Sequence, residues 1–185
     1  MLAALALTSC NSDKQEVVPT TTSPTPPPAT RTTTTTAPSA PAVANPLDAS
    51  DFEASPCTSL TKAQQQQYGI TRTERTTLAA TEGESCFFHR PGTDDPIWVV
   101  FSSKISNGLT YRYIEHERGS WGYWKPTELD GYPAVAFGNT DPPACFFAVG
   151  ISDSLHFSVS ASTDKTCTES RQVAATILAN IEATN

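Results

Sequence analysis

The chain has 185 residues, 38% of them hydrophobic and 17% charged, and its formal net charge is −7 at pH 7. This acidic balance argues against a nucleic-acid partner, because phosphate binding requires a basic face. It also argues against a body that lies flat on anionic lipid.

The chain opens with a short apolar run that ends in small residues and a cysteine, the pattern that a signal peptidase reads. Leu7-Thr8-Ser9-Cys10 resembles a lipobox, whose cysteine receives a diacylglyceryl group. Two acyl chains suffice for stable membrane anchoring. We interpret residues 1–10 as a lipoprotein signal peptide and Cys10 as its lipidation site; the alternative is an ordinary N-terminus with an incidental cysteine. Because no Lys or Arg precedes Cys10, we expect the start to be truncated.

Residues 11–45 are predicted to form a disordered Thr/Pro-rich tether. The segment is almost wholly Thr, Pro, Ser and Ala from residue 19 onward. Such a composition buries too little apolar area to offset the entropy of ordering the backbone. Clustered prolines favour polyproline II, which extends about 3.1 Å per residue. The folded domain is therefore expected to span residues 46–185.

The cysteines divide into Cys10 and an even set within the domain, namely Cys57, Cys86, Cys145 and Cys167. Four cysteines allow three pairings. The sequence has no C-x-x-C pair and its histidines are scattered, so we expect no metal site and no cofactor. Two disulfides in an oxidising compartment are the favoured interpretation, and four reduced thiols in a cytosolic protein are the alternative.

The first half of the domain predicts a helix and then a β-hairpin. Thr61 and Gln64 fit a capping box, so a short helix is expected from Lys62 to Tyr68, ended by Gly69. Two aromatic and β-branched runs, residues 84–90 and 96–101, predict the hairpin. Asp94 and Asp95 between them are typical of turn chemistry rather than a metal site.

Residues 102–125 are the least regular part and concentrate aromatic side chains. Five of these form a candidate binding surface: Tyr111, Tyr113, Trp121, Tyr123 and Trp124. Such residues could stack against a glycan or line a groove for a lipid. The alternative is that alternate residues fill the core from a strand. Glu115, His116 and Glu117 have no nucleophile or metal motif beside them, so we expect no catalytic residues.

The last part predicts three strands and a helix. Residues 133–137 and 144–151 have strand character, and Leu155–Ala161 alternates between apolar and polar residues. This alternation predicts one buried and one wet face, with His156 solvated. Thr166 and Glu169 fit a second capping box, before a helix through Ala183 whose apolar residues recur at helical spacing.

Together these elements predict an α+β domain, in which an antiparallel β-sheet is packed by a short N-terminal helix and a C-terminal helix. The hairpin that ends near Ala161 returns the chain to the side of Cys145. A bridge from Cys145 to Cys167 is therefore reachable, which leaves Cys57 to pair with Cys86. A Cys57–Cys167 pairing would contradict this arrangement.

Several short motifs resemble the DUF3558 family of actinobacterial lipoproteins. They are Asn45-Pro46, Pro56-Cys57 before a Leu-Thr-x-Ala helix, Cys86-Phe87-Phe88, Gly131-Tyr132-Pro133-Ala134-Val135, Cys145 at a strand and Cys167 before an Ala-rich helix. The resemblance implies a Thr/Pro-rich tether, one extracytoplasmic domain and four paired cysteines. It implies no reaction, because the family has no agreed activity.

These features predict a lipoprotein anchored by Cys10 at the extracytoplasmic face of the cell membrane. We expect a non-catalytic module that binds an envelope glycan, lipid or protein through the aromatic surface. The alternative is an accessory or scaffold subunit of an envelope complex. We do not expect an enzyme, because no nucleophile, base and orienting group occur in a recognisable arrangement.

Overall fold

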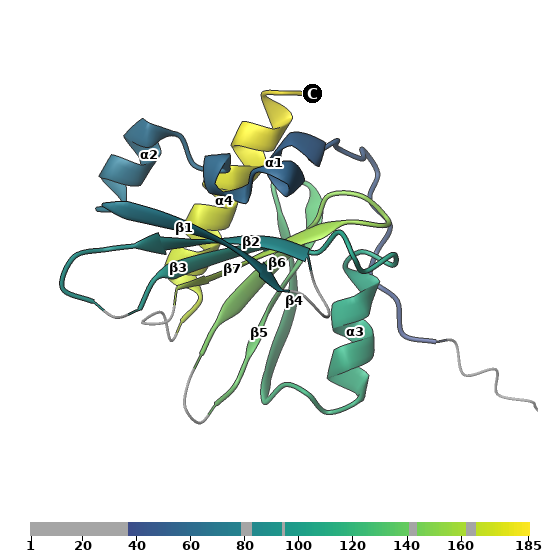
Figure 1. Cartoon of the computed structure of the whole chain (residues 1–185). Coiled ribbons are helices and arrows are strands. Elements are labelled where there is room, and N and C mark those ends of the chain that lie inside the picture. The colour runs from purple at the N-terminus through teal and green to yellow at the C-terminus, as the bar shows by residue number, and fades with distance from the viewer. Residues whose placement is uncertain (1–36, 79–82, 94, 141–143, 162–165) are drawn as a thin grey trace, which may run out of the picture. The chain divides into compact units, whose positions relative to one another are not determined.

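The structure of the chain, a computed structural model, describes residues 37–78, 83–93, 95–140, 144–161 and 166–185. Residues Thr36–Asn185 form one unit, in which helices lie on both faces of a β-sheet (Figure 1). The predicted signal peptide with Cys10, and the predicted tether as far as residue 36, lie outside the described residues.

The folded unit begins before the boundary predicted at residue 46. The backbone N–H of Ala40 donates to Thr110 Oγ1 at 3.1 Å, and that of Val43 donates to Asp153 Oδ1 at 3.2 Å. The side chain of Val43 is buried in the main core. Composition alone assigned residues 40–45 to the tether, but one apolar side chain and two backbone hydrogen bonds attach them to the domain.

Seven antiparallel strands form one sheet: β1 (Arg72–Leu78), β2 (Gly83–His89), β3 (Ile97–Phe101), β4 (Tyr123–Leu129), β5 (Tyr132–Gly138), β6 (Phe146–Gly150) and β7 (His156–Ala161). Their order in the sheet is β1-β2-β3-β7-β6-β5-β4. Two runs of consecutive hairpins, β1 to β3 and β4 to β7, therefore meet where β3 pairs with β7. The predicted hairpin is confirmed as β2 and β3, and the predicted α+β class is confirmed.

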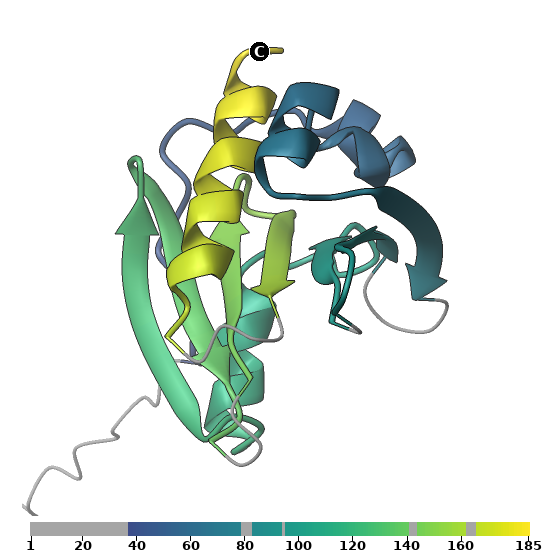
Figure 2. The same ribbon diagram turned by 90° about the vertical axis from the view of Figure 1, so that its left-hand side faces the viewer.

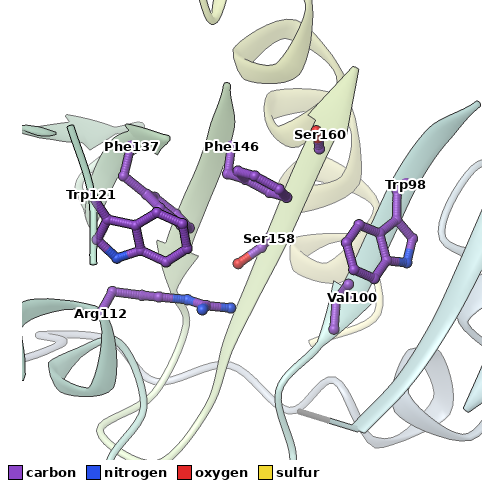
Figure 3. A pocket seen from close by; sticks show the side chains of 8 residues that line it. All are labelled: Trp98, Val100, Arg112, Trp121, Phe137, Phe146, Ser158 and Ser160. Carbon is purple, nitrogen blue, oxygen red and sulfur yellow. The ribbon is translucent and has the colours of Figure 1, made fainter. Parts of the chain in front are cut away.

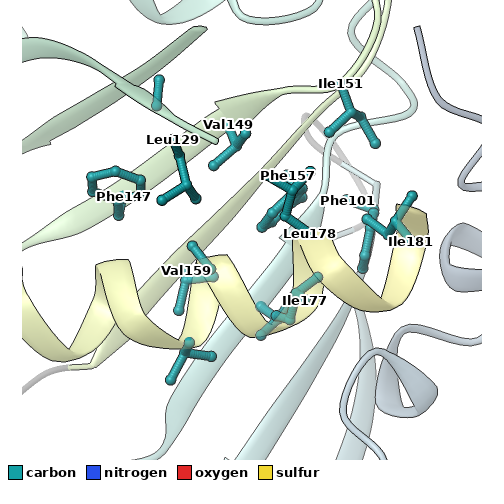
Figure 4. Packing of buried hydrophobic residues seen from close by; sticks show 14 of the residues in the cluster. Phe101, Leu129, Phe147, Val149, Ile151, Phe157, Val159, Ile177, Leu178 and Ile181 are labelled. Carbon is teal, nitrogen blue, oxygen red and sulfur yellow. The ribbon is translucent and has the colours of Figure 1, made fainter. Parts of the chain in front are cut away.

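One face of the sheet is covered by α1 (Ser50–Ala54), the 3-10 segment η1 (Pro56–Thr58), α2 (Lys62–Gln67) and α4 (Thr168–Glu182). Figure 2 shows α4, in yellow, beside the blue N-terminal helices. The apolar stripe of α4 packs on the sheet as predicted, with Ile177, Leu178 and Ile181 fully buried near Phe101 and Phe157 (Figure 4). Each such side chain contributes about 1.5–3 kcal/mol by leaving water.

The predicted capping box at α2 is confirmed. Thr61 Oγ1 accepts the backbone N–H of Gln64 at 3.3 Å, and Gln64 Oε1 accepts that of Thr61 at 2.7 Å. Gly69 follows the helix with a φ of 70°, which glycine adopts without a Cβ penalty. Gln64 also donates to Asn180 Oδ1 at 2.9 Å, so the capping residue ties α2 to α4.

Both predicted disulfides are confirmed. Cys57 in η1 bonds to Cys86 in β2, and Cys145 just before β6 bonds to Cys167, with Cα atoms 5.1 Å and 5.4 Å apart. The second capping box is wrong. Cys167 itself is the N-cap of α4, with a φ of 60° and no side-chain capping bond, because the side chain at this position is engaged in the disulfide.

The opposite face carries α3 (Thr110–Glu117), so the strand considered for this segment is wrong. Leu109, at its N-cap, is buried with Val135, Phe137 and Ala148. Leu109 and the α3 residues that turn inward, Arg112, Tyr113 and His116, fall at positions i, i+3, i+4 and i+7, which is the spacing of one helix face.

The wet face predicted for β7 is also wrong. All six residues of β7 are buried, and His156 has no exposed surface. The strand lies in the middle of the sheet, with α4 on one side and α3 and its flanking segments on the other. The alternation of apolar and polar residues shows which residues share a face of the strand. It does not show that the polar face is exposed, because both faces of a central strand can be covered.

Candidate functional site

A row of side chains crosses the α3 face of the sheet. In sheet order it consists of Trp98 on β3, Ser160 on β7, Phe146 on β6, Phe137 on β5 and Trp124 on β4, each opposite the next. Because paired residues in a sheet project to the same side, all five share this face. The rings of Phe146 and Phe137 stack with centroids 5.4 Å apart.

Serine interrupts this aromatic row at the central strand. Ser160 stands between Trp98 and Phe146, and Ser158 lies opposite Val100 on the same face. A hydroxymethyl group is much smaller than the rings beside it, so a hollow remains above β7. We call this the serine pocket. Its volume is about 230 Å³. It is lined by Trp98, Val100, Arg112, Trp121, Phe137, Phe146, Ser158 and Ser160 (Figure 3).

Trp121, from the segment between α3 and β4, forms one wall of the serine pocket. Its ring meets Phe137 edge-on with centroids 4.8 Å apart and lies 6.2 Å from Phe146. On the other side of β7, the ring of Trp98 lies edge-on to Phe146 at 6.3 Å. A group bound in the pocket would therefore meet indole and phenyl surfaces on opposite sides.

Arg112 brings a charged group from α3 to the pocket wall. The residue is only 4% exposed. Its Nε donates to His156 Nε2 at 3.2 Å, and its guanidinium carbon lies 5.1 Å from the centroid of the Phe137 ring. Guanidinium groups stack on aromatic faces and are weakly hydrated for a cation, which makes them suited to such a site.

His156 supports Arg112 from β7 as a neutral acceptor. Complete burial lowers the pKa of His156 well below its usual value of 6.5, and the charge of Arg112 lowers it further, against a hydrogen bond with the Gly108 backbone. A neutral imidazole has one acceptor nitrogen, and here that nitrogen faces the Arg112 donor. The pair therefore fixes Arg112 in place through the strand that also carries the two pocket serines.

The serine pocket has the composition of a binding site. Five of its lining residues are aromatic or aliphatic, and the remaining three supply a guanidinium and two hydroxyls. Ligand sites combine apolar walls with a few placed polar groups in this way. The arrangement can hold an apolar group and can hydrogen-bond to a polar atom attached to that group.

The structure does not bring the five predicted aromatic residues together on one surface. Trp121 lines the serine pocket, whereas Trp124 packs next to it between Tyr113 at 5.1 Å and the stacked ring of His116 at 4.4 Å. Tyr111 flanks Arg112, with the guanidinium carbon 5.3 Å from its ring centroid.

Tyr123, the fifth predicted residue, belongs to the opposite face of the sheet. It is 38% exposed and lines a second hollow, of about 380 Å³, with Lys125 and Arg171. Tyr123 is therefore separated from the serine pocket by the sheet and provides a control position for it.

Seven pocket residues were not identified from the sequence: Trp98, Val100, Arg112, Phe137, Phe146, Ser158 and Ser160. The serines were assigned to a wet face, and the rings were assigned to strands without a face. The sequence pattern that could have indicated the pocket is a pair of small residues, Ser158 and Ser160, at alternate positions of one strand. This pattern indicates a hollow only when the neighbouring strands are known to carry aromatic residues on the same face.

The two other histidines of the domain, His116 and His89, contact neighbouring side chains. His116 stacks on Trp124, and His89 Nε2 lies 3.4 Å from Glu74 Oε2 on adjacent outer strands. Within the described ranges, no three His, Cys, Asp or Glu side chains are grouped so that they could hold a metal ion. In the same ranges, no helix is long and apolar enough to cross a membrane.

Fold and site together define a disulfide-linked α+β domain with an aromatic pocket on one face of its sheet. The sequence model described as "Protein of unknown function (DUF3558)" matches residues 5–180. The chain therefore belongs to the DUF3558 family. No curated protein and no solved structure matches the chain.

Proposed function

We propose that the protein is a non-catalytic binding module of the cell envelope, and that the serine pocket holds an apolar group of its ligand. The observation that carries the proposal is the interrupted aromatic row, in which Ser158 and Ser160 leave a hollow between Trp98 and Phe146. A core selected only for stability would be filled to native density at this place.

The proposed location is the extracytoplasmic face of the cell membrane, with a diacylglyceryl anchor on Cys10. The lipobox-like sequence before Cys10 and the Thr/Pro-rich residues after it support this proposal. Two disulfides in the domain also support it, because disulfides persist in oxidising compartments.

The anchor is tested by metabolic labelling with a clickable fatty acid. We expect the wild-type chain to carry the label and the Cys10→Ser chain to lose it. Label that persists on Cys10→Ser would contradict the anchor and leave the binding proposal unaffected.

The pocket is tested by filling it. Ser160→Leu places a branched apolar side chain between Trp98 and Phe146, so bound material should be displaced while the domain remains folded. The tagged wild-type chain and the variant are purified from native envelope, and organic extracts of each are compared by mass spectrometry. We expect one or more apolar compounds with the wild type and none with Ser160→Leu.

Tyr123→Ala is the matched control, because it removes an exposed aromatic ring from the opposite face. This variant should retain the compounds bound by the wild type. Equal recovery from Ser160→Leu, or loss from Tyr123→Ala alone, would place binding elsewhere. Stoichiometric recovery of one envelope protein, with no small compound, would favour the accessory role instead.

A further inference from the structure

We infer that the ligand group held in the serine pocket is a ring or short acyl chain that carries a carbonyl oxygen as hydrogen-bond acceptor. This inference rests on the proposed binding function and specifies its ligand chemistry. It follows from the kind of polar groups in the pocket wall and from the unmet hydrogen bonds of Trp121 and Ser158.

The polar groups of the pocket wall are chiefly donors. Arg112, Trp98 and Trp121 can only donate, and the hydroxyls of Ser158 and Ser160 can donate or accept. Among the described residues that line the pocket, none is a carboxylate or an amide. A ligand that offers only donors would therefore find few partners, whereas an acceptor oxygen would find several.

Three of these donors are buried and have no hydrogen-bond partner within the described part of the chain: the indole Nε1 of Trp98, the indole Nε1 of Trp121 and the hydroxyl of Ser158. The nitrogen of Trp98 lies on the side of its ring away from Ser158 (Figure 3), so Trp121 and Ser158 are the donors considered for a ligand oxygen. Ser158 is 2% exposed. Buried donors without a partner are rare in folded proteins and call for a specific explanation. A ligand oxygen would supply the missing partner.

Figure 3 shows how these groups are arranged. The hydroxyl of Ser158 points towards the side of the pocket occupied by Trp121, and the guanidinium of Arg112 reaches towards Ser158 from α3. The ring of Trp98 stands across β7 from this polar end. A bound group would direct its oxygen to the Ser158 side and place its apolar part against Trp98 and Phe146.

His156 on β7 helps to hold the polar end of the pocket in place. Its Nε2 accepts the Nε–H of Arg112, which orients the guanidinium from the β7 side. Because His156 and Ser158 are alternate residues of one strand, they share a face, and the strand positions both groups together.

The inference is tested with pairs of probes that differ only in the acceptor. Acetophenone is compared with α-methylstyrene, in which a methylidene group replaces the oxygen, and butyl methyl ketone is compared with its corresponding alkene. Binding to the full chain is measured by tryptophan fluorescence and by ligand-detected NMR. We expect the ketone of the better-fitting pair to bind about 2- to 10-fold more tightly than the alkene, the effect of one net hydrogen bond.

Two variants test whether the pocket donors cause the preference for the ketone over the alkene. Ser158→Ala removes the hydroxyl, and Trp121→Phe removes the indole N–H while keeping a ring. The variant that removes the group donating to the ketone should bring the ketone-to-alkene ratio close to one. Ser55→Ala, at an exposed serine near η1, should leave the ratio unchanged.

The outcomes separate the inference from the function on which it rests. If ketone and alkene bind the wild type equally, the pocket is retained and the carbonyl inference is overturned. A ratio that survives in both Ser158→Ala and Trp121→Phe overturns it as well. If no probe binds, the pocket itself fails and both proposals are withdrawn. Binding by the ring pair alone assigns an aromatic ligand, and binding by the chain pair alone assigns an acyl chain.

Discussion

His156 shows how one residue can couple a strand to a helix without carrying charge. It has no exposed surface, and its Nε2 accepts the Nε–H of the Arg112 cation. A protonated imidazole would place two positive charges next to each other in the protein interior, which is why the folded state holds the neutral form.

The pKa of His156 predicts acid sensitivity of the fold. Burial and Arg112 depress this pKa in the folded state, whereas the unfolded chain has a value near 6.5. As the pH falls below 6.5, the unfolded state binds a proton at His156 that the folded state does not bind. The free energy of unfolding therefore decreases by up to about 1.4 kcal/mol per pH unit. Above that pH the contribution is fully present.

Urea unfolding between about pH 7 and pH 5 measures this effect. His156→Gln keeps an acceptor for Arg112 but cannot titrate, so its stability should fall less steeply with decreasing pH than that of the wild type. Parallel curves for the two proteins would show that His156 does not cause the acid sensitivity.

Two buried serines predict opposite responses to the same substitution. Ser170 accepts the backbone N–H of Ala161 at 3.1 Å, so Ser170→Ala leaves a buried donor unpaired and should lower the free energy of unfolding by about 1–3 kcal/mol. Ser158 has no partner among the described residues, so Ser158→Ala should change it by less than about 0.5 kcal/mol or raise it.

Chemical denaturation of both variants tests this contrast. A large loss of stability for Ser158→Ala would reveal a structural hydrogen bond at this hydroxyl and remove the reason to regard it as a ligand contact.

The residues of the serine pocket illustrate what sequence could supply at this scale. Trp121 was identified because it lies in an aromatic-rich segment, and the cysteines because they form an even set. Ser158, Ser160 and His156 were assigned to solvent, since alternation identifies two faces of a strand but does not show whether the second face is covered.

At the scale of elements, the two proposed capping boxes had different outcomes. Thr61 and Gln64 make the reciprocal bonds, whereas Cys167 takes the N-cap position of α4. Both sequences fit the same local pattern. The difference is a long-range one, because the disulfide to Cys145 holds the chain at the start of α4 and displaces the expected cap by one residue.

Thr61→Ala should lower the free energy of unfolding by about 1 kcal/mol, the usual effect of losing an N-cap oxygen. Thr61→Ser keeps the oxygen and should have nearly wild-type stability. Thermal or urea denaturation of the two variants provides the measurement. Equal destabilisation of both would mean that the threonine methyl group, and not the cap, carries the effect.

The spacing of the inward residues of α3 is helical, but their residue types conceal it. One helical face carries Leu109, Arg112, Tyr113 and His116. Because two of these residues are an arginine and a histidine, the face lacks the apolar periodicity that would predict a helix. Burial of Arg112 becomes understandable only with His156 and Phe137 beside it, and these come from distant strands. Tertiary contacts thus decide the structure of this segment.

At the scale of the whole molecule, sequence predicted the class of fold but not the order of the strands. Hairpins are local, and the sequence predicted the β2–β3 hairpin and the strands β5, β6 and β7, but it predicted neither β1 nor β4. The pairing of β3 with β7 joins Trp98 to Ser160 across more than sixty positions of the chain. The serine pocket exists only because of that pairing, so no local pattern could reveal it.

A ligand in the serine pocket should also affect the rate of unfolding, because the pocket lies at the seam where β3 pairs with β7. Trp98 and Val100 come from the first run of hairpins, and Phe137 and Phe146 from the second, so a bound group bridges both halves. The halves could not separate without releasing it. An occupant should therefore slow unfolding more than it speeds folding, provided the seam forms after the folding transition state. The module would then persist longest where its ligand is abundant.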